Sequence, residues 1–547
     1  MAIPRADMTA VVDHVVVGAG SAGCVLARRL AEAGRSVLVL EAGGDDRGID
    51  EVRIPASFPN LFRTEHDWDY ETVEQRHAGG RRMYWPRGRL LGGSSSMNAQ
   101  LYVRGNRLDY DTWRDELGCK GWGFADLLPY FLRAEDNARG PSAYHAVGGP
   151  LRVEDPRFTH ELSAAFVDAA QVYGIPRNDD ANGAEQDGAG LFQVTQRRGE
   201  RCSAAHAYLR PAMAMPGVRV ETDALATRVV VEGGRATGVE YVCRGRRLFA
   251  RAEAEVLLCG GAVNSPQLLL LSGIGPTDHL RDVGVEVVAD VPGVGGNLQD
   301  HLGAGAIWLT HGTRSLHDHE TVGALLRWRA LRSGPLTSTI AEAYAFVRSR
   351  DGLPAPDLQI HVAPVAFANH GLQEPPGPGF TAAPVLVSVA SRGSVRLRSV
   401  NPAWRPAIDA GYLEADEDLE ALVAGTRLVR EVARLGALPG FLREEYLPGE
   451  SARTDDNLRA AVRRHSQTLY HPVGTCAMGV GDQGVVDTEC RVHSVDALRV
   501  VDASVMPAVP RGNTNAATIA IAEKASDHVL GRPPLPPYDP TALPSRS

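Results

Sequence analysis

Three glycines near the start of the chain have the spacing needed to bind a dinucleotide. Gly18 permits a tight turn, Gly20 lets the backbone approach a pyrophosphate, and Gly23 lets a helix pack closely on a strand. The helix that follows presents free N–H groups and partial positive charge to the phosphates. Glu41, 18 positions after Gly23, stands where an acid accepts hydrogen bonds from an adenosine ribose. These residues predict an FAD or NAD site, and the acid argues against NADP, whose 2′-phosphate favours an arginine.

The elements that must position these residues surround them in the sequence. Residues 15–17 are a β-branched run suited to a buried strand, and residues 25–33 carry apolar side chains at nearly helical spacing. Gly34 ends that helix, and residues 36–40 form a second apolar strand. A glycine-rich turn that binds no nucleotide would not need a strand, a helix, a second strand and an acid in this order.

Length and charge exclude several classes of protein. A chain of 547 residues is expected to form two domains. Its net charge of −9 gives no general attraction for nucleic acid. No apolar run approaches the ~20 residues that span a bilayer, and the first ten residues lack the apolar core of a signal peptide, so we expect a cytoplasmic protein without an integral membrane segment. The seven cysteines are scattered without a C-x-x-C pair, which predicts neither a metal site nor a disulfide framework.

Later segments add strands, loops and a second domain. Gly92 and Gly93 precede three serines in a loop that can bring N–H groups against an anion or a flat ring. Residues 218–251 alternate in polarity between glycine turns, which predicts a β-meander. Residues 304–460 contain no nucleotide motif and are expected to form a second domain. The tail after Gly531 is rich in proline and is expected to be disordered.

Four blocks together resemble the glucose–methanol–choline (GMC) oxidoreductase family. They are the glycine motif at 18–23, the segments 88–98 and 261–275, and Tyr470-His471-Pro472 with Asn515 beyond it. The two central segments look like the signature sequences of the family, and the blocks extend from residue 12 to about residue 530. The chain looks most like the choline dehydrogenase and alcohol dehydrogenase branch.

The resemblance implies FAD as the cofactor and an α/β (α+β) fold. A Rossmann-like FAD-binding domain would combine residues 11–155, 217–310 and 462–530. A substrate-binding domain with an antiparallel sheet and flanking helices would combine residues 156–216 and 311–461, leaving tails at 1–10 and 531–547. Some members bond FAD covalently through a histidine where Met97 stands, and because a thioether cannot form that bond, we expect non-covalent FAD.

Motif position also implies which residues contact FAD. Around the ADP half these are Gly18, Gly20, Ser21, Ala22, Gly23 and Glu41, with the backbone of Val229 near the adenine. Along the flavin they are Gly92, Gly93, Ser94, Met97 and Asn98. Near the pyrophosphate and the ring they are Asp502, Ala503 and Asn515.

The resemblance further implies a mechanism in which a primary alcohol is oxidised to an aldehyde. Flavin N5 takes the hydride, and the protein must supply a base and hold the developing alkoxide. His471 matches the catalytic base of the family, and histidine suits this role because its pKa lies near working pH. Asn515 matches the second active-site position, where an amide can donate a hydrogen bond to the alkoxide.

Other functions within and outside the family remain open at this point. The family also contains non-redox hydroxynitrile lyases and oxidases of sugar or aminosugar hydroxymethyl groups in antibiotic pathways. A flavin-binding protein without catalysis is a third possibility, against which His471 and Asn515 argue. The small-molecule substrate could be cationic if an acid such as Glu342 lined the pocket, and the electron acceptor could be oxygen, a quinone or another carrier.

Overall fold

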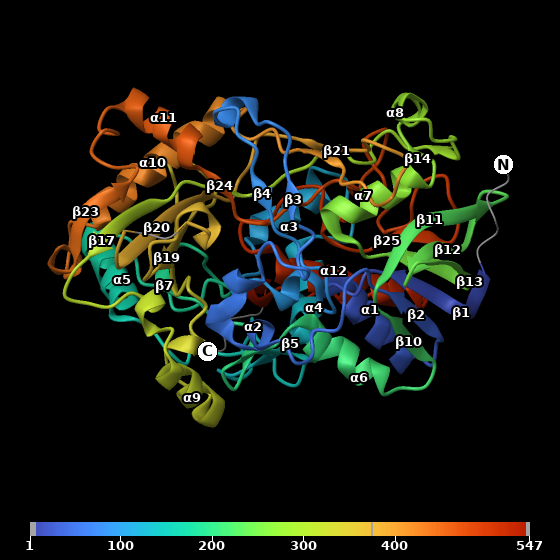
Figure 1. Cartoon of the computed structure of the whole chain (residues 1–547), viewed down its shortest axis with the longest axis horizontal. Coiled ribbons are helices and arrows are strands. Elements are labelled where there is room, and N and C mark those ends of the chain that lie inside the picture. The colour runs from blue at the N-terminus through green and yellow to red at the C-terminus, as the bar shows by residue number, and fades with distance from the viewer. Residues whose placement is uncertain (1–6, 374–375, 543–547) are drawn as a thin grey trace.

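The strand–helix–strand unit at the start of the chain lies in the middle of a seven-stranded sheet (Figure 1). The computed structural model describes residues 7–373 and 376–542 of the chain. In this unit α1 (Ser21–Glu32) connects the parallel strands β1 (Asp7–Val17) and β2 (Val37–Leu40). The strand order is β10 (Val218–Glu221), β2, β1, β13 (Arg246–Leu258), β12 (Arg235–Cys243) and β11 (Ala224–Glu232), with β25 (Leu498–Val500) also on β13. β10 is parallel to β2, β13 is parallel to β1, and β25 is parallel to β13.

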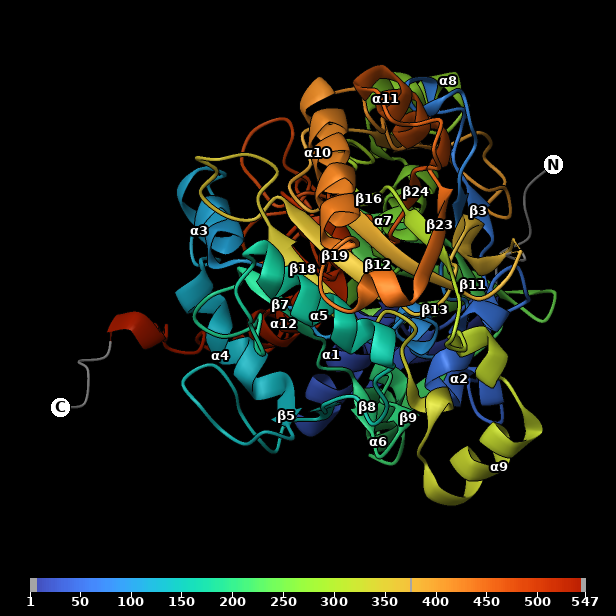
Figure 2. The same ribbon diagram turned by 90° about the vertical axis from the view of Figure 1, so that its left-hand side faces the viewer.

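A second, antiparallel sheet lies at the opposite end of the molecule (Figure 1). Its main path is β23 (Leu442–Leu447), β17 (Ala306–Thr310), β20 (Gly379–Leu386), β19 (Leu358–Ala363), β18 (Ala343–Val347) and β7 (Gly188–Leu191). The short strand β16 (Leu302–Gly303) pairs with β20, and β24 (Gln467–Thr468) pairs with β16. The helices α5 (Glu161–Tyr173) and α10 (Asp416–Val432) pack on it, and Figure 2 shows α10 lying over its strands.

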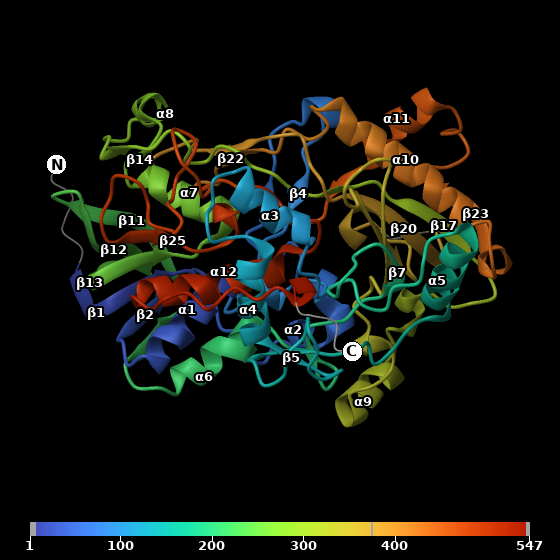
Figure 3. The same ribbon diagram turned by 180° about the vertical axis from the view of Figure 1, so that it is seen from behind.

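Helices join the two sheets and cover the first. Figure 3 shows α12 (Thr514–Val529) beside α1 and α4 (Phe124–Ala134), and all three helices contribute to one apolar core with the first sheet. α7 (Gly261–Leu271) starts directly after β13. The remaining longer helices are α3 (Arg107–Asp115), α8 (Thr277–Asp282), α9 (Val322–Leu331) and α11 (Asp455–His465). No helix of the described ranges has both the length and the apolar character needed to cross a membrane.

The mixed α/β architecture agrees with the fold class predicted from the sequence, with some local differences. β10 leaves the expected meander and pairs with β2 instead, so only β11 to β13 are antiparallel neighbours. β16, β17 and β24 lie in the second sheet although they fall within segments assigned to the FAD-binding domain, so the domain boundaries stay a prediction.

The expected disorder of the C-terminal tail is wrong for its described part. Leu535 N–H donates to the hydroxyl of Tyr130 and Tyr538 N–H to the carbonyl of Ala125, each at 2.8 Å. These contacts fix the tail on α4, and β1 likewise extends into the N-terminal segment predicted as a tail. Residues 1–6 and 543–547 lie outside the described residues.

Candidate active site

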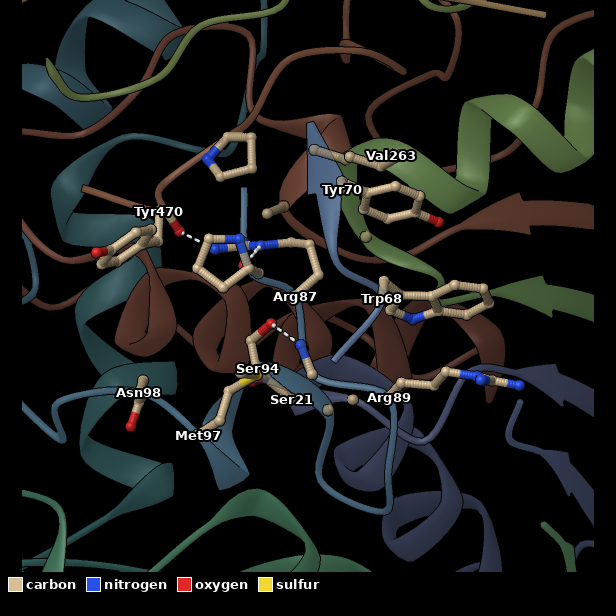
Figure 4. Close-up of a pocket in the computed structure, with 18 of the residues that line it drawn as sticks. Ser21, Trp68, Tyr70, Arg87, Arg89, Ser94, Met97, Asn98, Val263 and Tyr470 are labelled. Atoms are coloured by element: carbon tan, nitrogen blue, oxygen red, sulfur yellow. Dashed lines mark hydrogen bonds between the residues drawn. The ribbon is translucent and has the colours of Figure 1, made fainter. Parts of the chain in front are cut away.

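A cavity of about 560 Å³ lies between the two sheets. Its wall combines the turn between β1 and α1, the start of α7, the loops before α12, and the edges of β19 and β20. Figure 4 shows Tyr470, Met97 and Asn98 at one end of the cavity and Trp68, Tyr70 and Arg89 at the other. Segments distant in the sequence therefore meet at one site, which is the usual location for ligands in α/β folds.

Each of the three positions of the motif requires glycine for a different structural reason. Gly18 has a φ of +100°, and a Cβ there would lie 2.6 Å from the carbonyl oxygen of Cys259. A Cβ on Gly23 would lie 1.9 Å from the carbonyl oxygen of Gly18, so only glycine lets α1 approach β1 this closely. Gly20 is different, because a Cβ would point into open space at the cavity, 3.9 Å from the nearest atom.

The carboxylate of Glu41 is fixed beside this turn. Its two oxygens accept hydrogen bonds from the N–H groups of Ala19 and Gly43, both at 2.9 Å. Burial raises the pKa of Glu41 to about 6, while these donors act in the opposite direction. Each oxygen keeps a further lone pair, so the carboxylate can still accept a ribose hydroxyl.

Most of the residues predicted to contact FAD lie on the cavity wall. These are Gly18, Gly20, Ser21, Ala22, Glu41, Gly93, Ser94, Met97, Asn98, Asp502, Ala503 and Asn515. Asp502 also holds the first turn of α7, since it accepts hydrogen bonds from Gly261 N–H at 2.8 Å and the Ser265 hydroxyl at 2.6 Å. Gly23 and Gly92 do not line the described cavity: Gly23 packs α1 against the glycine turn, and Gly92 forms a turn with a φ of +88°.

Val229 lies in β11, the strand whose first residues, 224–226, line the cavity. Its side chain is buried, its N–H donates to the Ser272 hydroxyl at 2.8 Å, and it does not belong to the described cavity wall. Alternation along the strand explains the burial of the side chain. The contact between the Val229 backbone and the adenine stays a prediction.

The wall has the features that FAD requires. Gly20 and Gly261 leave space for a pyrophosphate, and the first turn of α1 has no side-chain cap, so its N–H groups remain available. Arg89 lines the same region, and its buried Nε has no hydrogen-bond partner within the described chain. The thioether of Met97 on the wall offers no nucleophile for a covalent flavin bond.

His471 is held from three sides at the other end of the cavity. Its backbone N–H donates to Asp300 Oδ1 at 2.7 Å. Of its ring nitrogens, Nδ1 lies 3.0 Å from Nδ1 of His301 and Nε2 lies 3.2 Å from Nδ2 of Asn513. Because Asn513 Oδ1 faces the amide of Gln359 at 3.4 Å, its NH₂ group points to His471. His471 Nε2 therefore accepts, and Nδ1 carries the proton shared with His301.

The structure pairs His471 with Asn513 and places Asn515 elsewhere on the cavity wall, so the active-site role of Asn515 stays a prediction. Asn515 lies in the first turn of α12, and its Oδ1 accepts a hydrogen bond from Ser21 at 2.7 Å. Asn513 directly precedes the helix, and its side chain makes no cap hydrogen bond. Residues two apart at a helix start face different directions. The sequence motif contained both asparagines, and only the geometry identifies the one beside His471.

Two further residues escaped the sequence analysis. Asp300 accepts hydrogen bonds from the hydroxyls of Thr468, at 2.5 Å, and Tyr412 in addition to His471 N–H, so it fixes the backbone that carries the imidazole. Arg87 lies on the wall and donates to the carbonyl of Tyr470 at 2.5 Å. Neither residue belongs to a pattern with a readable spacing; only the fold brings them to His471.

Glu342 does not line the described cavity wall. It is 1 % exposed, and its carboxylate accepts hydrogen bonds from the hydroxyls of Ser338 and Ser163 and from His160 N–H. The suggestion that Glu342 faces a cationic substrate is therefore wrong.

Burial controls the charge of the titratable groups near His471. It lowers the pKa of four imidazoles: to about 3 for His301 and His370, to about 4 for His361, and well below the usual range for His471. It raises the pKa of the Asp300 carboxyl to about 6, as it does for Glu41. The imidazoles are therefore neutral at pH 7, the form in which a histidine can accept a proton.

These shifts predict a protein that loses stability on acidification. Between pH 6 and pH 4 the unfolded chain protonates the four histidines and the folded chain does not, while Asp300 and Glu41 behave in the opposite way. Four protons taken up by the histidines less two released by the carboxyls leave about two protons taken up on unfolding, so the free energy of unfolding should fall by about 2.7 kcal/mol for each pH unit of acidification. Denaturant titrations of the holoprotein at pH 6, 5 and 4 measure this slope.

A matched variant isolates the contribution of one imidazole. His370 has a φ of +62°, which asparagine tolerates, so His370→Asn should preserve the backbone and reduce the slope by about one proton. Stability that rises on acidification, or an unchanged slope in the variant, would contradict the assignment of neutral buried histidines.

Comparison with known proteins agrees with this site. The two models of the family described as GMC oxidoreductase match residues 12–303 and 389–522. The chain is 42 % identical to human mitochondrial choline dehydrogenase over 97 % of its length and 92 % of that protein. It is 41 % identical to oxygen-dependent choline dehydrogenase of Brucella anthropi, covering 96 % of each.

Solved structures extend the comparison to the fold. Pyridoxine 4-oxidase from Mesorbium loti is 32 % identical with a TM-score of 0.87, covering 95 % of this chain and 99 % of that one. A variant of formate oxidase from Aspergillus oryzae RIB40, whose study concerns FAD modification, is 28 % identical with a TM-score of 0.90 over 96 % and 99 %. The chain belongs to the GMC oxidoreductase family and is an FAD-dependent oxidoreductase of CH–OH groups.

Proposed function

We propose that the enzyme oxidises a primary alcohol to an aldehyde, with His471 as the base and Asn513 as the hydrogen-bond donor. The observation that carries this proposal is the pair formed by a neutral imidazole and an amide on the cavity wall, 3.2 Å apart. A substrate hydroxyl that replaces this contact would give its proton to Nε2 and receive a hydrogen bond from the amide.

The chain's own residues support each part of this chemistry. When bound, FAD accepts the hydride from the alcohol carbon. His471 takes the hydroxyl proton, and its Nδ1–H remains donated to His301, whose low pKa keeps that ring an acceptor. Asn513 stabilises the developing alkoxide with a donor that its contact to Gln359 orients in advance. Asp300 holds the backbone of His471, which keeps the imidazole oriented toward the substrate hydroxyl.

An anaerobic absorbance titration tests the proposed reaction. The yellow holoenzyme is mixed with a panel of primary alcohols that begins with choline, since the curated relatives are named choline dehydrogenases. Loss of the flavin band with an alcohol supports oxidation, and no loss with any member would favour the lyase reaction instead. Admitting air then separates acceptors, because fast recovery indicates oxygen and slow recovery indicates a quinone or another carrier.

Asn513 and Asn515 provide a matched pair of substitutions. Asn513→Ala removes the donor beside His471 and is expected to slow flavin reduction by about 10²- to 10³-fold. Asn515→Ala removes only the contact to Ser21 and should slow the same step by less than about tenfold. Anaerobic stopped-flow absorbance measures both. A larger decrease of the reduction rate in Asn515→Ala than in Asn513→Ala would indicate that Asn515 is the donor.

A further inference from the structure

A strained turn forms part of the cavity wall beside Tyr470. Ile340 has a φ of +68°, a left-handed conformation that a β-branched residue rarely adopts. Its side chain lines the cavity and packs against the apolar cluster that contains Phe58, Phe62 and Met97. Strain of this kind persists only where the surroundings impose it, and it concentrates at functional sites.

The buried carboxylate of Glu342 imposes this conformation through Ser338. The Ser338 hydroxyl donates to Glu342 Oε1 at 2.6 Å and accepts from Ile340 N–H at 3.1 Å. Glu342 is itself held by His160 N–H at 2.8 Å and by the Ser163 hydroxyl at 2.7 Å. A fully paired buried network thus directs an apolar side chain into the cavity.

The side chains that pack around Ile340 on the wall are apolar or aromatic. Phe62 packs edge to face on Phe58 and on Tyr470, each with ring centroids 5.9 Å apart, and Met97 belongs to the same cluster. The hydroxyl of Tyr470 is bonded to His370 Nδ1 at 2.6 Å. Because the nearby imidazoles are neutral, this end of the cavity offers a surface for hydrocarbon beside the base.

The acids of the described cavity wall are already paired. Glu41 and Asp502 are bonded at the dinucleotide end, and Asp67 accepts from the N–H groups of Arg63, Asp69 and Arg87 and from the Tyr84 hydroxyl. Three arginines line the wall as well: Arg87, Arg89 and Arg405. The three arginines balance the three carboxylates, so a positively charged substrate would lose its hydration without meeting a net negative charge.

We propose that the turn at Ile340 restricts this enzyme to uncharged, apolar primary alcohols and that Ile340 is the specificity-determining residue. The inference rests on the proposed function, whose base and donor supply the hydroxyl contacts. It distinguishes the chain from relatives that are named for a cationic alcohol.

Choline and 3,3-dimethylbutan-1-ol test the proposal, since they have the same shape and differ by a nitrogen cation in place of a carbon. Binding is read from the shift of the flavin absorbance bands, which needs no turnover, and reduction from anaerobic stopped flow. The holoenzyme should bind the neutral alcohol at least about tenfold more tightly. Tighter binding of choline overturns the inference. The expected order of binding without flavin reduction by any alcohol would overturn the proposed function and leave the inference intact.

Substitutions at Ile340 test its role directly. Asparagine and aspartate both tolerate a left-handed backbone, so Ile340→Asn and Ile340→Asp should fold, which circular dichroism and flavin content check. Ile340→Asp adds a carboxylate to the wall and should shift the ratio of the two affinities toward choline by at least about tenfold. Ile340→Asn adds polarity without charge and should shift it less than about threefold. An equal shift in both variants, or none in Ile340→Asp, would remove Ile340 from substrate selection.

Discussion

Replacing His471 by alanine is expected to leave FAD bound and to slow flavin reduction by about 10³-fold. The imidazole lies on the cavity wall opposite the glycine turn, so its loss removes no feature of the dinucleotide end. It does remove the acceptor Nε2, which Asn513 cannot replace because its amide can only donate there. Flavin absorbance after gel filtration measures retention, and anaerobic stopped flow with the preferred alcohol measures reduction.

Chemical rescue separates a lost base from a distorted site. Imidazole added to the His471→Ala enzyme should restore part of the rate, and the restored rate should rise with pH as free imidazole loses its proton. A rescue that does not depend on pH would indicate that the ring only fills space. Reduction within about tenfold of wild type in the unrescued variant would rule out His471 as the base.

The sequence predicted the dinucleotide end well because that end depends on local geometry. Gly18, Gly23 and Glu41 act within one strand–helix–strand unit, where spacing along the chain determines spacing in the structure. Family resemblance added the remote segments. The α/β fold class also followed from the resemblance. The partner of β10 depended on which edge strand was free, and no local pattern encodes that choice.

The catalytic end was less predictable because its contacts join distant segments. Asn513 and Asn515 are chemically identical and two positions apart, and only the start of α12 decides which one faces His471. Asp300 belongs to none of the motifs read from the sequence, and only the fold places it behind the backbone of His471. Ile340 is an ordinary apolar residue in the sequence, and its importance comes from a backbone angle that composition does not reveal.

Gly23→Ala and Gly20→Ala are expected to fail for different reasons, although both lie in the same motif. A Cβ on Gly23 would meet backbone oxygen at 1.9 Å, and no side-chain movement relieves that contact. The variant should lose about 3 kcal/mol of unfolding free energy even without FAD. A Cβ on Gly20 has open space, so the apoprotein should keep its stability while FAD affinity falls by tenfold or more, about 1.4 kcal/mol.

Thermal unfolding of the apoprotein and quenching of FAD fluorescence on titration separate the two effects. Gly23 packs α1 against the backbone of β1, so its alanine variant should show a lower unfolding midpoint before any cofactor is added. Gly20 faces the cavity, so its variant should differ from wild type only once FAD is titrated. If Gly20→Ala binds FAD as wild type does, the pyrophosphate does not approach this turn and the cofactor must lie elsewhere along the wall. If Gly23→Ala is as stable as wild type, the close approach of α1 to β1 does not hold the unit together.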